Sequence, residues 1–207
     1  MASGAYSHAE GYSTTALGKR SHAEGSNTNA FGQDSHAEGA YTTASGYQAH
    51  AEGLSCESSG DESHSEGNGC VASGGQSHAE GYYTNAIGDH SFAGGRNSTA
   101  TAICSFAHGD HVSAQGVNST VFGKYNSPNA TDLFQIGNGT AETASNALAV
   151  DTSGNTTIAG QYIDKTGEKL VPLVPINESE LDVTKEEWIE NNAKEGVFYA
   201  FYEDDSN

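Results

Sequence analysis

Residues 7–39 read SHAEGYSTTALGKRSHAEGSNTNAFGQDSHAEG, and the phrase SHAEG returns in them every fourteen residues. Histidine and glutamate are residues that hold metal ions or transfer protons. A catalytic site, however, needs one constellation of such side chains rather than a series of copies. The repeat therefore indicates an architecture before it indicates a reaction.

The repetition extends well beyond this stretch, at a period of seven. Glycine occupies seventeen of the eighteen sites spaced by seven from residue 4 to residue 123, and Ala102 is the single exception. Alanine stands two residues before fifteen of these eighteen sites. The unit is [ST]-x-A-x-G-x-x, and SHAEG units alternate with T-x-A-x-G units, so the full repeat is fourteen residues long.

The heptads favour strands over a coiled coil, because each interior glycine costs a helix about 1 kcal/mol and the heptad sites lack Leu and Ile. In a strand, alternation places the Ser and Ala of SHAEG on one face and its His and Glu on the other. We expect the glycine and the two residues after it to form the turn. The predicted fold class is all-β, a parallel β-roll or β-solenoid of fourteen-residue rungs stacked at about 4.8 Å.

The inward sites of this predicted solenoid carry small residues. Ala, Ser and Thr bury few methylene groups, each worth about 0.8 kcal/mol, whereas ordering a residue costs about 1.5 kcal/mol. Cys56 and Cys70 lie fourteen residues apart, so we expect them to stack in adjacent rungs as small buried thiols. A single narrow roll is marginally stable by this comparison, which predicts a homo-oligomer.

The paired S-x-A-x-G heptads, which cover about 120 of the 207 residues, resemble the head repeats of trimeric autotransporter adhesins, also found in phage and prophage tail fibres. The resemblance implies a left-handed parallel β-roll that assembles side by side as a homotrimer. Members of that family commonly place Val and Ile at the outward strand sites where this chain has His and Glu.

The outer face of the SHAEG strands is the predicted seam of the trimer. Phenylalanine replaces His or Glu in the later rungs, and phenylalanine favours burial, so we expect these strands to face the three-fold axis. Interchain His–Glu hydrogen bonds are the favoured interpretation of the polar rungs, with no cofactor; a metal ion on the axis is the alternative. The predicted seam consists of His8, Glu10, His22, Glu24, His36, Glu38, His50, Glu52, His64, Glu66, His78, Glu80, Phe92, Phe106 and Phe122.

The composition changes twice after the repeats, which predicts three segments: a β-roll at 1–123, a β connector at 124–160 and a C-terminal segment at 161–207. The connector contains three short predicted strands, LFQIG, ALAVD and TTIAG, and is similar to connectors of phage tail fibres in which the chains of a trimer intertwine. The last segment is predicted to be a small α+β cap or receptor-binding tip. It contains a helix starting at a capping box, Thr184 to Glu187, and a strand over 197–202. Its candidate receptor-binding residues are Trp188, Phe198, Tyr199, Phe201 and Tyr202.

Charge and hydropathy exclude several functions. The net charge is −19 with eight Lys and Arg, which argues against binding to nucleic acids or anionic membranes. No apolar run approaches the roughly 20 residues of a membrane-spanning helix, so we expect no membrane insertion.

These observations and the resemblance predict a non-enzymatic, structural and host-attachment segment of a phage or prophage tail fibre. It would work on the virion tail and bind a glycan or a protein of the host cell surface. The alternative is the head of a trimeric adhesin on a bacterial surface. A glycan-cleaving tailspike is the alternative of a different class, but we find no pair of carboxylates set apart from the regular pattern.

Overall fold

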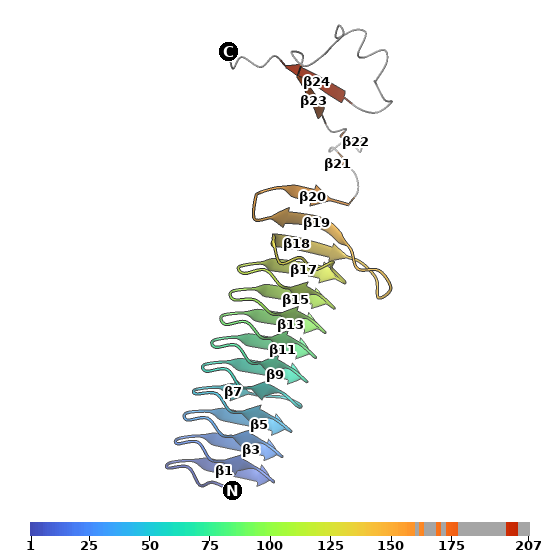
Figure 1. The fold of residues 1–207 in the computed structure, drawn as a ribbon. Coiled ribbons are helices and arrows are strands. Elements are labelled where there is room, and N and C mark those ends of the chain that lie inside the picture. Colours follow the sequence, from blue (N-terminus) through green and yellow to red (C-terminus); the bar gives the residue numbers. More distant parts are fainter. Residues whose placement is uncertain (160–161, 164–168, 171–172, 178–197, 203–207) are drawn as a thin grey trace, which may run out of the picture. The chain divides into compact units, whose positions relative to one another are not determined.

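The structure is a computed structural model that describes residues 1–159, 162–163, 169–170, 173–177 and 198–202 (Figure 1). The chain divides into two compact units, Met1–Ala159 and Gly160–Asn207. All regular elements in the described residues are β-strands. The first unit is a parallel β-solenoid of about nine fourteen-residue turns, which confirms the predicted fold class.

One wall of the solenoid is formed by the SHAEG strands and their equivalents. These strands pair in parallel with an offset of fourteen residues, so that Ala9 lies opposite Ala23 and Glu10 opposite Glu24. The wall contains β1 (His8–Tyr12), β3 (His22–Ser26), β5 (His36–Ala40), β7 (His50–Ala51), β9 (His64–Asn68), β11 (His78–Tyr82), β13 (Phe92–Arg96), β15 (Phe106–Asp110) and β17 (Thr120–Lys124).

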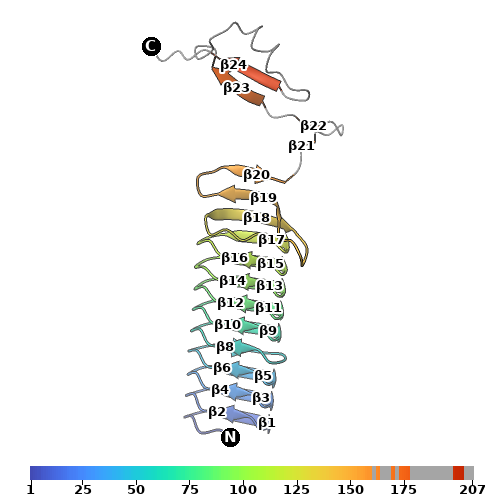
Figure 2. The same cartoon turned by 45° about the vertical axis from the view of Figure 1, so that its right-hand side comes forward.

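The second wall is formed by the alternate heptads, each of which contributes a strand of two residues (Figure 2). Its eight strands are also parallel and have the same fourteen-residue register. They are β2 (Thr15–Ala16), β4 (Asn29–Ala30), β6 (Thr43–Ala44), β8 (Glu57–Ser58), β10 (Val71–Ala72), β12 (Asn85–Ala86), β14 (Thr99–Ala100) and β16 (Ser113–Ala114).

The core between the two walls is narrow and contains small side chains. Alanines at the heptad positions, such as Ala23 and Ala30, are fully buried, and Val112 and Val121 are the largest aliphatic residues in the buried set. Cys56 and Cys70 are buried free thiols, as predicted. The burial of alternate residues confirms that Ser and Ala of SHAEG point inward.

The turns repeat with the heptad and depart from the prediction at one point. We expected Gly25 and the two residues after it to form the turn, but Gly25 and Ser26 belong to strand β3, and Asn27 is the left-handed residue, with φ of 56°. Gly25 itself has φ of 116°, a conformation that side-chain-bearing residues rarely adopt. A Cβ at this position would also overlap the carbonyl oxygen of Gly39 in the next rung. Two constraints, conformation and close approach, therefore keep this position a glycine.

The serine that opens each SHAEG unit has a structural role in the turn before it. The Ser21 hydroxyl donates to the carbonyl of Gly18 at 2.7 Å, and the Ser35 hydroxyl donates to that of Gly32 at 2.7 Å. These hydroxyls are buried, so the hydrogen bond offsets the cost of removing them from water. This bond explains why the motif carries serine rather than a second alanine.

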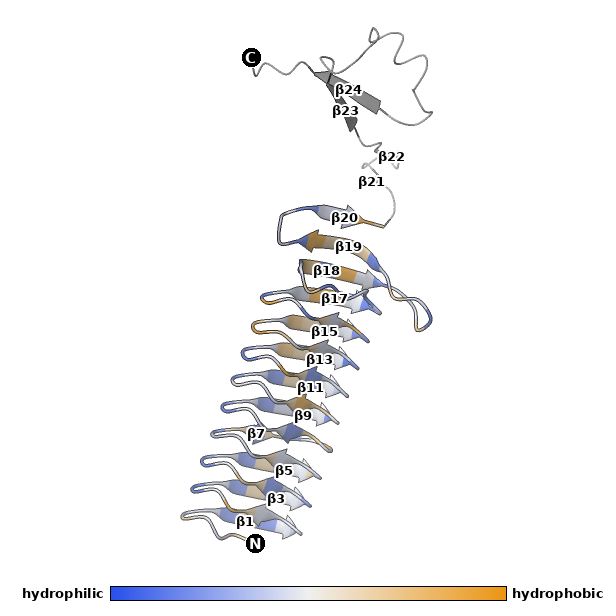
Figure 3. Ribbon diagram, viewed as in Figure 1, coloured by the Kyte–Doolittle hydropathy of each residue, from blue (hydrophilic) through white to orange (hydrophobic). Residues whose placement is uncertain are grey.

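The fourteen-residue register continues past the last heptad. Strand β18 (Asp132–Asn138) pairs in parallel with β17, with Gly137 opposite Gly123. Strands β19 (Asn146–Asp151) and β20 (Thr156–Ile158) then add antiparallel to the same sheet. The three short strands predicted for the connector are therefore present. Strands from β15 to β19 also carry more apolar residues than β3 and β5 (Figure 3).

The second unit is described only in part. Strand β21 (Tyr162–Ile163) pairs antiparallel with β22 (Lys169–Leu170), and β23 (Leu173–Asn177) pairs in parallel with β24 (Phe198–Tyr202). Strand β24 lies within the predicted 197–202. The helix predicted from the capping box at Thr184 lies outside the described residues. Within the described part of the chain there is no helix with the length and hydropathy needed to cross a bilayer.

Candidate functional site

The outer face of the long sheet carries two columns of polar side chains, which we call the His column and the Glu column. Strand alternation directs both outward from the alanine core, and the parallel register places each residue over its equivalent in the next rung. The predicted residues are therefore brought together within one chain. The His column contains His8, His22, His36, His50, His64 and His78, and the Glu column contains Glu10, Glu24, Glu38, Glu52, Glu66 and Glu80.

The imidazoles of the His column stack along the solenoid. The ring centroids of His36 and His50 are 4.8 Å apart with an interplanar angle of 2°, and those of His50 and His64 are 4.7 Å apart with an angle of 3°. Burial lowers the pKa of His50, and the neighbouring His64 lowers it further. Burial is also the main cause that lowers the pKa of His36 and His64. These rings are therefore held in the neutral form near pH 7, with one ring nitrogen free to accept a bond.

The Glu column lines a groove of about 540 Å³, whose floor consists of the glycines that follow each glutamate. Stacked carboxylates repel one another, and one response is the sharing of a proton. Contact with Glu38 raises the pKa of Glu52 to about 7, with burial and Glu66 as further causes. The pKa of Glu66 is lowered, first by its contact with Glu52, which supplies the proton. Near neutral pH the middle of the groove therefore holds a proton that Glu52 shares with its neighbours, while Glu66 stays ionised.

The two columns lie close together, but they are not joined by hydrogen bonds in the described part of the chain. The Nε2 atom of His64 is 3.7 Å from a carboxylate oxygen of Glu52, and that of His78 is 3.4 Å from Glu66 and 3.9 Å from Glu80. These separations exceed the 2.7–2.9 Å typical of a charge-assisted hydrogen bond. The Nε2 atoms of His36, His50, His64 and His78 are buried and have no hydrogen-bond partner. The predicted interchain His–Glu bonds involve a second chain and stay a prediction.

The aromatic end of this face follows the polar columns directly. Phe92 and Phe106 occupy the His column, and Phe122 occupies the Glu column, as the register pairs it with His108. The rings of Phe92 and Phe106 stack at 4.7 Å, and that of Phe122 lies 5.4 Å from Phe106. Phe122 is 40% exposed. One face thus combines unpartnered polar atoms with aromatic rings that are half-buried or, at Phe122, exposed.

The candidate receptor-binding residues are placed only in part. Phe198, Tyr199, Phe201 and Tyr202 lie in β24, which pairs in parallel with β23. Trp188 lies outside the described residues. Their assignment to receptor binding stays a prediction.

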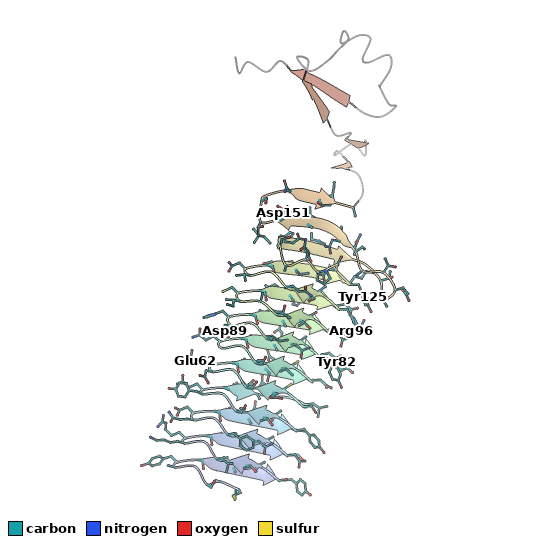
Figure 4. The ribbon with its side chains drawn as sticks, viewed as in Figure 1. Glu62, Tyr82, Asp89, Arg96, Tyr125 and Asp151 are labelled. Atoms are coloured by element: carbon teal, nitrogen blue, oxygen red, sulfur yellow. The ribbon has the colours of Figure 1, made fainter. Side chains whose placement is uncertain are left out.

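The sequence interpretation missed a second group of residues at the ends of the rungs. Tyr82, Arg96 and Tyr125 project from one edge of the solenoid, whereas Glu62 and Asp89 project from the opposite edge (Figure 4). Residues fourteen apart pair on these edges, and Arg96 donates two hydrogen bonds to Asp110 at 2.8 and 2.5 Å. The signal was the fourteen-residue spacing of opposite charges, which the parallel register turns into contacts.

Comparison with known proteins gives a family match to the first rungs. The family model of the YadA head domain repeat spans two copies of the repeat. It matches four overlapping stretches of the chain, residues 1–21, 9–35, 23–49 and 37–54. No curated protein matches the chain. The match confirms the resemblance drawn from the S-x-A-x-G heptads.

Proposed function

Because the chain carries YadA head repeats in a parallel β-solenoid, an adhesin-type structural segment, we propose that it is a trimeric, non-enzymatic host-attachment segment. In this proposal residues 1–123 are the rigid stem, residues 124–160 connect it to the C-terminal segment, and residues 161–207 bind the receptor. The protein would act outside the cell that made it or on an exposed surface, as adhesins do.

The observation that carries this proposal is the outer face of the long sheet. Its aromatic end leaves Phe122 40% exposed next to the stacked rings of Phe92 and Phe106. Its polar end holds buried Nε2 atoms without partners. Contiguous exposed apolar residues mark protein interfaces, and unpartnered polar atoms gain from a bonding partner. The same face of two further copies would cover the exposed aromatic end, which supports a trimer joined along this seam.

A phage or prophage tail fibre is the context we propose for this segment. The support is the sequence resemblance of the connector to those of tail fibres, together with the apolar strands β18 and β19 that follow the solenoid. The head of a trimeric bacterial surface adhesin is the second candidate, and the YadA head repeat favours it. A tailspike that cleaves glycans has less support, because the carboxylates of the described face repeat in every rung from Glu10 to Glu80 instead of forming one distinct pair.

The proposal is tested by binding of the full chain, fluorescently labelled, to whole cells. We expect binding to bacterial cells and a loss of at least about tenfold when Trp188 and Phe201 are both replaced by Ala, since aromatic anchors dominate many interfaces. Tyr6→Ala is the matched control, because Tyr6 is an aromatic residue that is 87% exposed on the first rung. Circular dichroism of each variant would show that the strands are retained.

Each other outcome identifies a different function. Loss of binding with Tyr6→Ala alone would place the receptor surface on the solenoid. Binding to animal cells rather than to bacteria would favour the surface adhesin over the tail fibre. Release of new reducing ends from a host capsule fraction would overturn the non-enzymatic assignment.

A further inference from the structure

The strongest unassigned chemistry lies in the middle of the two polar columns. Three groups there each bring one imidazole nitrogen and two carboxylate oxygens within 4.8 Å of one another. We propose that these triads bind divalent transition-metal ions of the Zn²⁺ type, with ligands from a single chain. This inference goes beyond the attachment function and does not depend on it. The triads are Glu38–His50–Glu52, Glu52–His64–Glu66 and Glu66–His78–Glu80.

The distances between the ligand atoms fit a shared ion better than direct contact. In a tetrahedral site with bonds of about 2.1 Å to nitrogen and oxygen, two ligand atoms lie about 3.4 Å apart. The Nε2 atom of His78 is 3.4 Å from Glu66 and 3.9 Å from Glu80, and that of His64 is 3.7 Å from Glu52. In the triad of His78 these separations are within about half an ångström of the tetrahedral value. In the other two triads the ligand atoms lie up to 4.8 Å apart, so side-chain rotations of about 1 Å would bring the three ligands onto one ion.

The Nε2 atoms supply the second, independent observation. Those of His50, His64 and His78 are shielded from solvent and have no hydrogen-bond partner, although they sit beside carboxylates. An unpartnered buried nitrogen costs free energy, and a metal ion would use its lone pair. His8, on the first rung, differs: its ring nitrogen contacts His22 at 3.3 Å, and its side chain is 63% exposed.

The groove along the Glu column provides room for the remaining ligands. It has a volume of about 540 Å³ and is lined by Glu24, Glu38, Glu52 and Glu66 with their following glycines. A water molecule on the open side of an ion would complete a four-coordinate site of one nitrogen and two carboxylate oxygens. Imidazole favours Zn²⁺ and its neighbours over Mg²⁺ and Ca²⁺, which prefer oxygen ligands alone.

The overlap between the triads fixes the expected number of ions. The first and third triads share no residue, whereas the middle triad shares Glu52 with one and Glu66 with the other. Two divalent ions on adjacent rungs would be about 5 Å apart and would compete for one carboxylate. We therefore expect about two ions per chain rather than three, one on each outer triad.

The experiment measures bound zinc in the full chain without an affinity tag. The protein is stripped with a chelator, dialysed against a low micromolar concentration of Zn²⁺, and analysed by inductively coupled plasma mass spectrometry, with isothermal titration as a second readout. We expect His50→Gln and His78→Gln each to lower the content from about two ions to about one, because the two triads left in each variant share a carboxylate. His64→Gln should keep about two ions, since both outer triads remain.

His64→Gln is a matched control because it removes a stacked imidazole from the same column without removing an outer triad. The triple variant His50→Gln, His64→Gln, His78→Gln should bind no zinc above background, and circular dichroism checks that it is folded. The proposal is overturned if the wild type binds no zinc, or if the triple variant binds as much as the wild type. Calcium binding that equals zinc binding and ignores all three substitutions would also overturn it, as the carboxylates would then act alone.

Discussion

The first six rungs of the long sheet and its last three differ on the outer face while they share one backbone. From β1 to β11 the face carries His and Glu, whereas from β13 to β17 Phe92, Phe106 and Phe122 occupy outer sites, with His108 among them and no Glu. The inner face changes little across this boundary, since Ala79 pairs with Ala93 and both are fully buried. The register is thus fixed by the inner residues and glycines, and the outer positions are free to serve assembly or binding.

The boundary itself lies at Gly94, which replaces the glutamate of the earlier rungs. A Cβ at Gly94 would lie 2.7 Å from the ring of His108 and 2.9 Å from that of Phe92. The rings of Phe92, in the same rung, and of His108, in the next rung, therefore fill the space that a glutamate side chain would need at this position. The Glu column therefore ends at Glu80, and the aromatic end begins in the next rung, which contains Gly94.

The stacked heptad glycines are common to both regions, and replacing one of them should have the largest effect on stability. Gly39 has φ of 99°, and a Cβ there would overlap the carbonyl oxygen of Gly53. We expect Gly39→Ala to lower the free energy of unfolding by about 3 kcal/mol or more, because strain and overlap add. Chemical denaturation followed by circular dichroism would measure it.

The neighbouring Glu38→Gln is the control for this substitution. It changes an outward side chain on the same strand, 40% exposed, and we expect a change below about 1 kcal/mol. Equal effects of the two substitutions would contradict the view that the glycines, rather than the outer residues, fix the rung.

Substitutions in the predicted trimer seam should have the next largest effect, on trimer stability. The same Phe→Ser substitution can be made on each of the two walls. Phe106 lies between Phe92 and Phe122 on the long sheet, whereas Phe31 follows β4 on the other wall and is 44% exposed. If three copies meet along the long sheet, Phe106→Ser should weaken the trimer by about 2 kcal/mol per chain and Phe31→Ser should leave it unchanged. Analytical ultracentrifugation would follow the species of about 64 kDa, three times the 21.4 kDa of one chain. The reverse result would move the seam to the second wall.

Much of the fold was predictable because the same residue types recur at the same positions in every rung. The heptad glycines and alanines predict the rung length, the inward face and the stacking of Cys56 on Cys70. The replacement of His by Phe92 and Phe106 predicts which outer sites are equivalent. Each of these inferences needs only strand alternation and a fixed period.

The remaining features depend on geometry that a period does not contain. The hydrogen bond from Ser21 to the Gly18 carbonyl requires the turn conformation, and the placement of Gly25 inside β3 requires its φ angle. The distances between His and Glu decide between a hydrogen bond and a shared ion, and they depend on side-chain rotamers. The strand LFQIG was predicted, but its parallel pairing with β17 was not, although Gly137 stands fourteen residues after Gly123.

The edges of the rungs should show the smallest effect, although their ion pairs have good geometry. Arg96 donates two hydrogen bonds to Asp110, and together with His111 it lowers the pKa of that carboxyl to about 2. The pair is exposed, so we expect Asp110→Asn to reduce the free energy of unfolding by less than about 1 kcal/mol near neutral pH. Because the pKa in the folded protein is below the ordinary value of 3.8, the stabilisation is present above about pH 4 and is lost as the pH falls toward 2.

Melting temperatures of the wild type and Asp110→Asn at several pH values would therefore differ most above pH 4 and converge near pH 2. Asp34→Asn is an internal replicate, because Arg20 binds Asp34 across the same fourteen-residue spacing and lowers its pKa in the same direction. A difference that grows as the pH falls would contradict the ion-pair interpretation, since protonation removes the charge on which the pair depends.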